Sequence, residues 1–141
     1  MLNVEDDVVL DPYHYNEIAT ISNKFLTGMG CCSINDVAPL LTFILSTDYK
    51  KEFSKQEVII KLKSFFEQRI GFQNFSHTIE NIDFDINEGM DGYGLADGIV
   101  NYNTTLDSAI INSENIHFKL FFIYEEKNWK IFFFKFPEFI W

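Results

Sequence analysis

Apolar residues recur at helical spacing in the first half of the chain and alternate with polar residues in the second half. Near the start, Asp11 and Pro12 form a pair typical of a helix N-terminus, because proline fits the first helical turn. Apolar positions then recur every three or four residues as far as Met29, and Gly30 follows. The pattern predicts a first helix over residues 11–29.

Two further helices are predicted before residue 71. A short one begins near residues 33–36 and carries apolar positions as far as Leu45, provided that Pro39 lies within its first turn. The next begins at the capping box Ser54-Lys55-Gln56-Glu57, whose hydroxyl and carboxylate can each accept a hydrogen bond from a backbone N–H. Gly71 supplies its C-terminal stop, and its apolar face comprises Val58, Ile59, Leu62, Phe65, Phe66 and Ile70.

After residue 71 the apolar period changes to two, the period of a strand with one solvated face. We expect a polar connection at residues 106–114 and a tight turn at Lys127-Asn128. The order of elements predicts an α+β fold, with three N-terminal helices packed on one face of a curved, mostly antiparallel four-stranded sheet. The alternation places its strands at residues 82–87, 96–104, 116–125 and 129–137.

The size and composition fit one domain over residues 1–141. A domain of 141 residues buries about 70% of the surface that its unfolded chain exposes, which is enough for an independent core. Hydrophobic residues make up 47% of the chain, well above the content of disordered segments. We find neither an internal repeat nor a linker that would divide it.

The net charge of −10 argues against nucleic acids and anionic membranes as partners, because both are bound through clustered Lys and Arg. No stretch reaches the roughly 20 apolar residues that a membrane span needs. Residues 1–11 are acidic and do not resemble a signal peptide, so we expect a cytoplasmic protein. Cys31 and Cys32 are the only cysteines, too few for a disulfide framework.

The spacing of possible ligands predicts no metal and no cofactor. His14, His77 and His117 are far apart in the chain, and none has a second ligand at helical spacing. The run Asp83–Gly89 resembles the start of a calcium loop, but its glycine falls one place late and Gly94 stands where the closing glutamate would be. No serine has the Gly-x-Ser-x-Gly context of a hydrolase nucleophile.

Three segments resemble the nuclear transport factor 2-like superfamily, which includes SnoaL-like polyketide cyclases, ketosteroid isomerases and scytalone dehydratases. They are the acidic-aromatic step Leu45-Ser46-Thr47-Asp48-Tyr49, the capped helix ending in Phe65-Phe66 and Gly71, and the closing hairpin from Phe121 to Ile131. The resemblance implies a cystatin-like cone, in which a sheet curves around a helix and its open end holds a small apolar molecule. It also implies a dimer, and it carries over no catalytic motif.

The last hairpin supplies the candidate ligand contacts. With a two-residue turn at Lys127-Asn128, one of its faces is apolar enough to be the core under the helices: Ile116, Phe118, Leu120, Phe122, Tyr124, Trp129, Ile131 and Phe133. Tyr102 and Tyr124 would then present hydroxyls to the cone, with Tyr49 at its mouth. The predicted ligand-binding residues are Tyr49, Phe65, Tyr102, Phe122 and Tyr124.

Asp97 is the weak candidate for a catalytic residue. If its strand face lines the cone, burial would raise the pKa of this carboxyl and suit it to proton transfer. We favour a solvated Asp97, because burying the polar side chains beside it without partners is costly.

Three functions fit the sequence. The leading hypothesis is a small-molecule-binding domain with an aromatic cone-shaped pocket. The alternatives are an enzyme of the isomerase, dehydratase or cyclase type, which would use a carboxylate and a tyrosine such as Asp97 and Tyr102, and an acidic protein-interaction module. The fold alone does not choose among them.

The outer face of the last hairpin predicts a homodimer. It carries an apolar centre with a polar rim, which is the anatomy of a stable interface. Pairing about a two-fold axis would bring this centre onto its own copy. The predicted interface residues are Phe121, Ile123, Phe132 and Phe134.

Overall fold

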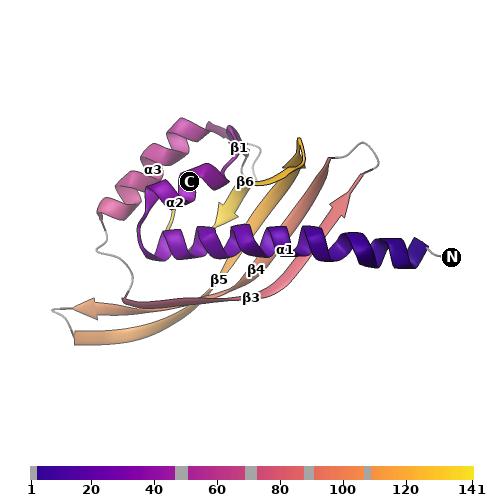
Figure 1. Cartoon of the computed structure of the whole chain (residues 1–141). Helices are drawn as coiled ribbons and strands as arrows, with labels where there is room; N and C mark the ends of the chain where they lie inside the picture. The colour runs from indigo at the N-terminus through magenta and orange to yellow at the C-terminus, as the bar shows by residue number, and fades with distance from the viewer. Residues whose placement is uncertain (1–2, 47–50, 69–72, 88–90, 107–108) are drawn as a thin grey trace.

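A four-stranded antiparallel sheet forms one layer of the protein, and helices cover one of its faces (Figure 1). The computed structural model describes residues 3–46, 51–68, 73–87, 91–106 and 109–141. The strands lie in the order β3-β4-β5-β6, so each pairs with its neighbour in sequence. They are β3 (Gln73–Ile86), β4 (Gly92–Leu106), β5 (Ala109–Glu125) and β6 (Asn128–Lys135). The predicted α+β class and the four-stranded antiparallel sheet are confirmed. The prediction that all helices precede all strands is wrong, because two short strands at residues 44–46 and 52–54 precede the third helix.

The first helix, α1 (Asn3–Gly30), is a single rod of 28 residues that crosses the sheet (Figure 1). The predicted start at Asp11 and Pro12 is wrong, because the helix continues through both. A proline inside a helix removes one backbone hydrogen bond, and here the turns on both sides continue the helix. Among the described residues, no helix is both long and apolar enough to cross a membrane.

The predicted second helix is wrong beyond its first turn. It consists of α2 (Ile34–Val37) and the 3-10 turn η1 (Ala38–Leu40), which contains Pro39. The chain is then extended, and its next residues form β1 (Ile44–Ser46), which pairs with β2 (Glu52–Ser54). Pro39 lacks an amide hydrogen and so removes one helical donor, but Ala38 before it is helical, and the chain becomes extended only at Leu41 (φ −94°, ψ 152°).

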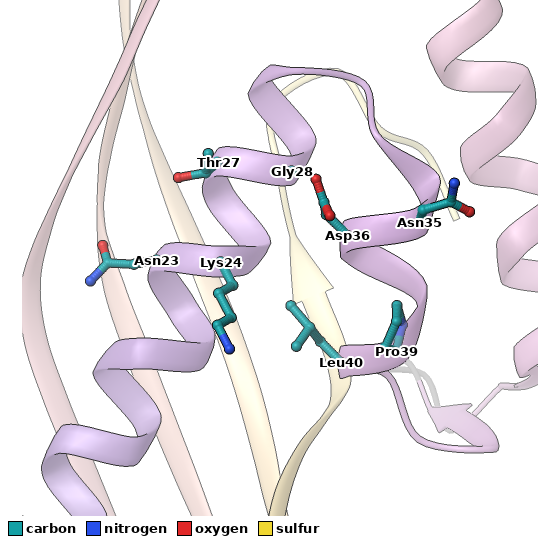
Figure 2. A pocket seen from close by; sticks show the side chains of 8 residues that line it. All are labelled: Asn23, Lys24, Thr27, Gly28, Asn35, Asp36, Pro39 and Leu40. Carbon is teal, nitrogen blue, oxygen red and sulfur yellow. The ribbon is translucent and has the colours of Figure 1, made fainter.

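Close contact with α1 positions α2. A Cβ atom at Gly28 of α1 would lie 2.8 Å from the Val37 Cγ2 atom and 3.2 Å from the Asp36 Cβ atom (Figure 2). Glycine is therefore the residue that lets the two helices approach at this point.

The capping box that begins the third helix, α3 (Lys55–Glu67), is confirmed. The Ser54 hydroxyl accepts a hydrogen bond of 3.1 Å from the Glu57 amide, and the Ser54 amide donates one of 3.0 Å to the Glu57 carboxylate. The helix buries one face against the rest of the protein, through Val58, Leu62, Phe65 and Phe66. The predicted stop at Gly71 lies outside the described residues.

The first three strands of the sheet, β3, β4 and β5, are longer than the alternation predicts, whereas β6 ends at Lys135, two residues before the predicted end. The polar connection expected at residues 106–114 is wrong, because β4 and β5 stay paired as far as Leu106 and Ala109. Backbone ladder bonds do not require apolar side chains, so a polar sequence can extend a hairpin beyond the helices that cover its base. The β5–β6 turn is at Glu126 and Lys127, one residue earlier than predicted, and both have the positive φ values (52° and 65°) of a tight hairpin turn.

A β-bulge at Phe132 reverses the faces of β6. Phe121 pairs with Phe133 and Phe122 with Ile131, so Phe132 is an extra residue on β6. Beyond the bulge, Phe134 faces the helices and is 0% exposed, whereas Phe133 shares the outer face with Phe121. The prediction that Phe133 faces the core and Phe134 faces outwards is therefore wrong, because one inserted residue exchanges inward and outward positions.

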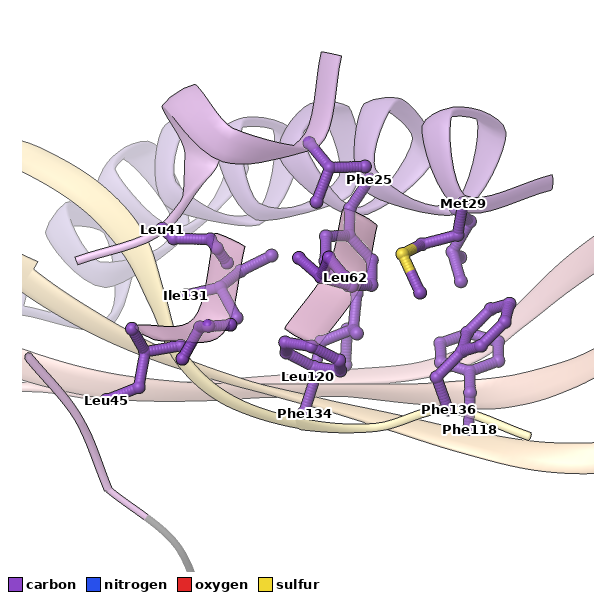
Figure 3. Close-up of a cluster of buried hydrophobic side chains, with 14 of the residues drawn as sticks. Phe25, Met29, Leu41, Leu45, Leu62, Phe118, Leu120, Ile131, Phe134 and Phe136 are labelled. Atoms are coloured by element: carbon purple, nitrogen blue, oxygen red, sulfur yellow. The ribbon is translucent and has the colours of Figure 1, made fainter. Parts of the chain in front are cut away.

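Apolar side chains from both layers fill the space between α1 and the sheet (Figure 3). Burying a side chain of this kind contributes about 1.5–3 kcal/mol, so this core holds the helices on the sheet. Its fully buried members include Phe25, Met29, Leu62, Phe118, Leu120 and Phe134.

Candidate functional site

The residues predicted to bind a ligand lie at two separate ends of the helix-covered face. Tyr124 pairs with Gly92, and Tyr102 lies ten residues further along β4, about 33 Å away at the usual rise per residue. Phe122 lies between these ends and is fully buried. Tyr49 lies outside the described residues. One small ligand could not contact both Tyr102 and Tyr124.

An aromatic cluster gathers at the Tyr102 end. Phe65 of α3 packs edge-on against Phe139, with ring centroids 5.5 Å apart and planes at 87°. Phe136 contacts Phe65 at 6.4 Å and Phe75 of β3 at 6.3 Å. The aromatic end cluster, as we name it, consists of Phe65, Phe75, Tyr102, Phe134, Phe136, Phe139 and Trp141. It draws on α3, three strands and the segment that follows β6.

A tyrosine and a carboxylate meet in this cluster. The Tyr102 hydroxyl donates a hydrogen bond of 2.8 Å to the Glu138 Oε2 atom. The Tyr102 side chain is 4% exposed, whereas Glu138 is open to solvent. Glu138 has φ = 68°, a conformation that residues other than glycine seldom adopt. A buried hydroxyl that donates to a carboxylate can fix the orientation of a polar group among aromatic rings.

A second aromatic group surrounds His14 of α1 at the Tyr124 end. Its imidazole packs against Tyr124, Phe84 and Trp129, with ring centroids 5.2, 5.6 and 5.9 Å away. The Trp129 indole donates a hydrogen bond of 3.2 Å to the His14 Nδ1 atom. A cleft of about 530 Å³ opens beside His14 and Tyr124, and acidic side chains form part of its wall: Asp91, Glu125 and Glu126.

Asp97 lies on the outer face of the sheet, away from the helices. Its carboxylate accepts a hydrogen bond of 3.1 Å from the Asn81 amide, and it pairs with Lys119 across the strands. Tyr102 lies on the other face of the same strand, so the structure does not bring these two together. The carboxylate beside Tyr102 belongs to Glu138, which the sequence reasoning did not single out.

The sequence contains one signal that points to Glu138. Pro137 cannot continue the ladder of β6, and two aromatic residues follow it, Phe139 and Trp141. Aromatic side chains after a strand-ending proline suggest that the chain folds back onto the core, where they can be buried.

The outer face of the hairpin holds three of the four predicted interface residues. Phe121, Ile123 and Phe132 are half-buried on this face, and Tyr93 of β4 is exposed beside Phe132, with ring centroids 6.0 Å apart. The fourth, Phe134, faces the core as described above. A groove of about 390 Å³ runs from Tyr93 and Phe132 to Phe43, which is 84% exposed.

Two further clefts lie beside α1. One of about 550 Å³ separates α1 from α2 and η1 and is lined mostly by exposed polar side chains, among them Asn23, Lys24 and Asp36 (Figure 2). The other, of about 490 Å³, contains His77, whose Nε2 atom lies 2.8 Å from the Asn23 Oδ1 atom. Burial lowers the pKa of His77 below its ordinary value. Among the described residues, no group of three or more His, Cys, Asp or Glu side chains could hold a metal ion.

Comparison with solved structures identifies the architecture. A presumed dehydratase of the nuclear transport factor 2-like family from Streptomyces avermitilis superposes with a TM-score of 0.61 at 8% identity, covering 84% of this chain and 90% of that one. The chain has the nuclear transport factor 2-like fold. A ketosteroid isomerase-like protein from Erwinia carotovora atroseptica shares this fold with a TM-score of 0.60 at 12% identity, over 84% of this chain and 91% of that one.

One of the similar solved structures has the cystatin-like fold that the sequence resemblance implies. An uncharacterised protein with a cystatin-like fold from Caulobacter vibrioides has a TM-score of 0.55 at 10% identity, and the match covers 85% of each chain. No family model matches the sequence, and no curated protein matches it. Identities this low establish the fold and leave the chemistry to the residues of this chain.

Proposed function

We propose that this domain binds a small, mainly apolar molecule at the aromatic end cluster of its cone. The observation that carries the proposal is the packing of rings from α3 and β3 against Phe136 and Phe139, in a segment whose Glu138 accepts a hydrogen bond from the Tyr102 hydroxyl of β4. Ligand sites are typically lined by aromatic and aliphatic side chains with a few polar groups that fix orientation. The end cluster has this composition.

Two solved neighbours give the proposal a context. One is a presumed dehydratase and another is ketosteroid isomerase-like. At 8% and 12% identity these descriptions support a ligand-binding cone by analogy of fold alone. The proposal therefore depends on Phe65 and Tyr102 of this chain.

A ligand screen with paired variants tests the site. Small aromatic and alicyclic compounds would be screened by thermal shift against the unmodified protein, and binding confirmed by calorimetry. We expect Phe65→Leu and Tyr102→Phe to weaken the confirmed compounds at least tenfold. Tyr124→Phe, at the other end of the sheet, is the control and should leave affinity unchanged. Compounds that respond to Tyr124 but not to Phe65 or Tyr102 would relocate the site and contradict the proposal.

One observation favours an enzyme as the second candidate. Tyr102 and Glu138 form the tyrosine–carboxylate pair that an isomerase, dehydratase or cyclase could use for proton transfer, in place of Asp97. On this alternative, Glu138→Gln would abolish turnover of a substrate found by the screen, and Asp97→Asn would leave it unchanged. Turnover that survives Glu138→Gln would exclude Glu138 as the catalytic carboxylate, and the absence of turnover of every bound compound would leave the domain as a binding protein.

We also infer a homodimer formed through the outer face of the sheet. The support is the apolar centre made by Phe121, Ile123 and Phe132, extended by the exposed ring of Tyr93. Exposed apolar patches of this kind usually mark interfaces. The third hypothesis, an acidic interaction module, would use the same face for a different partner.

A further inference from the structure

Residues 136–141, which follow β6, occupy the end of the cone where we propose that a ligand binds. Phe136 is buried and contacts Phe65 and Phe75. Phe139 contacts Phe65 at 5.5 Å and Phe134 at 5.2 Å. Side chains of residues 136–141 therefore occupy the space next to the other rings of the aromatic end cluster.

Three groups of this segment meet complementary groups of the cone. The Phe139 ring stands edge-on to Phe65. The Trp141 indole packs 4.7 Å from the Phe134 ring, and its N–H donates a hydrogen bond of 2.8 Å to the Phe134 carbonyl. The Glu138 carboxylate accepts the hydrogen bond from Tyr102. In chemical terms, the segment presents aromatic rings and one carboxylate.

The segment is held mainly through side chains. It lies beyond the last strand, and its backbone forms a turn in which the Phe139 amide donates to the Phe136 carbonyl at 3.1 Å. Glu138 has a left-handed φ of 68°, a conformation that is unfavourable for a residue with a Cβ atom. Ile140 between the two rings is 84% exposed. A segment held in this way can be displaced by a molecule that makes the same contacts.

Positive charge gathers beside this end of an acidic protein. Trp141 packs 5.7 Å from the Phe53 ring, and the Nζ atoms of Lys51 and Lys61 each lie 5.3 Å from the centroid of that ring. The Glu57 carboxylate interacts with both ammonium groups and offsets one of their two positive charges, so one positive charge is in excess here in a chain of net charge −10. This excess would favour an anionic ligand at the end cluster over a cationic one.

We propose that residues 136–141 act as an internal stand-in for the ligand, and that the ligand is an aromatic carboxylic acid. Its carboxylate takes the place of Glu138 on the Tyr102 hydroxyl, and its ring takes the place of Phe139 or Trp141. This inference rests on the proposed binding function and specifies the class of molecule that the site takes.

The test uses the full chain with the site opened by substitution. Calorimetry would compare 2-naphthoate with neutral 2-naphthamide, which has nearly the same shape. We expect the double variant Phe139→Ala/Trp141→Ala, called the opened protein below, to bind 2-naphthoate at least tenfold more tightly than the unmodified protein does. Ile140→Ala, an exposed position in the same segment, is the matched control and should behave like the unmodified protein.

Two further variants test separately whether the ligand must be an acid and whether residues 136–141 must be displaced. Adding Tyr102→Phe to the opened protein should weaken 2-naphthoate at least tenfold and leave 2-naphthamide unchanged. If the opened protein does not fold, Glu138→Gly replaces it, because glycine removes the competing carboxylate and accepts the positive φ. We expect this variant also to bind 2-naphthoate more tightly and to expose Trp141 to acrylamide quenching.

Each result has a distinct meaning. Equal binding of the acid and the amide by the opened protein would overturn the ligand class and leave the proposed function standing. Equal binding of the acid by the opened and unmodified proteins would overturn the stand-in role of the segment. A folded opened protein that binds neither compound, together with a ligand screen that finds no binder, would overturn both proposals.

Discussion

The indole nitrogen of Trp129 on β6 donates a hydrogen bond of 3.2 Å to the Nδ1 atom of His14 on α1, joining residues 115 positions apart. The bond links the longest helix to the last strand. It also determines the histidine tautomer, because an Nδ1 atom that accepts a hydrogen bond carries no hydrogen. His14 then presents its Nε2–H group.

The first prediction concerns this hydrogen bond. A double-mutant cycle of His14→Phe and Trp129→Phe should give a coupling free energy of about 1 kcal/mol, the usual net contribution of one hydrogen bond. Chemical denaturation of the four proteins measures it. Strictly additive single changes would show that the bond does not contribute to stability.

The second prediction concerns the capping box of α3. Ser54→Ala should lower the free energy of unfolding by about 1 kcal/mol, because the Glu57 amide loses its acceptor. Gln56→Ala, at an exposed position of the same turn, is the control and should have little effect. Equal stability of the Ser54 and Gln56 variants would contradict the prediction.

Glu57 should also make the contribution of this cap to stability depend on pH. The backbone hydrogen bond from Ser54 holds the pKa of Glu57 below its ordinary value of 4.5. A lowered carboxyl pKa contributes stability above the unfolded-state pKa, and this contribution is lost as the pH falls through the folded-state pKa. Glu57→Gln should therefore reduce stability at pH 7 and have a much smaller effect near pH 3. An effect independent of pH would argue against the cap.

His77 should make the protein less stable in mild acid. Burial lowers its pKa below the ordinary value of 6.5, so the unfolded chain binds a proton before the folded one does. This component of stability is present above about pH 6.5 and declines as the pH falls towards the folded-state pKa. In His77→Gln the decline between pH 7 and pH 5 should be smaller, as measured by urea unfolding at several pH values. Identical pH profiles would rule out this role of His77.

The sequence predicts well where local chemistry decides the structure. The Ser54 capping box and the core face of β5 follow from hydrogen-bonding groups and alternation within a few residues. The prediction of the second helix fails beyond Leu40, since apolar spacing alone does not distinguish a helical turn from an extended chain that buries Leu41 and Leu45. The longer hairpin of β4 and β5 was missed because backbone pairing can extend a strand through polar residues.

The candidate site was harder to predict, because it depends on contacts between distant segments. The bulge at Phe132 changes which phenylalanines of β6 face the core, and no local signal fixes the position of an inserted residue. Tyr102 was a predicted ligand contact, whereas its partner Glu138 lies 36 residues later. A hydrogen bond between residues so far apart cannot be read from spacing.

The outer face of the sheet gives a prediction about assembly. Phe121→Glu/Phe132→Glu should produce a monomer, because charged side chains would be buried at the centre of the proposed interface. Ile60→Glu, which changes an exposed apolar residue on α3, is the control and should leave the dimer intact. Sedimentation velocity measures both. An unmodified protein that sediments as a monomer at micromolar concentration would contradict the homodimer.

The last prediction concerns Ser22, a fully buried residue of α1. Its hydroxyl oxygen has no hydrogen-bond partner among the described residues. A buried polar group without a partner costs about 1–3 kcal/mol, and serine to alanine removes the hydroxyl with little change of volume. Alanine is also the better helix former, by a few tenths of a kcal/mol. We therefore expect Ser22→Ala to raise the free energy of unfolding by about 1 kcal/mol, as measured by urea denaturation. Thr27→Ala, at an exposed position of the same helix, is the control and should change this free energy by less than about half as much. A Ser22→Ala protein less stable than the unmodified one would show that the hydroxyl is bonded in solution and contributes to the fold.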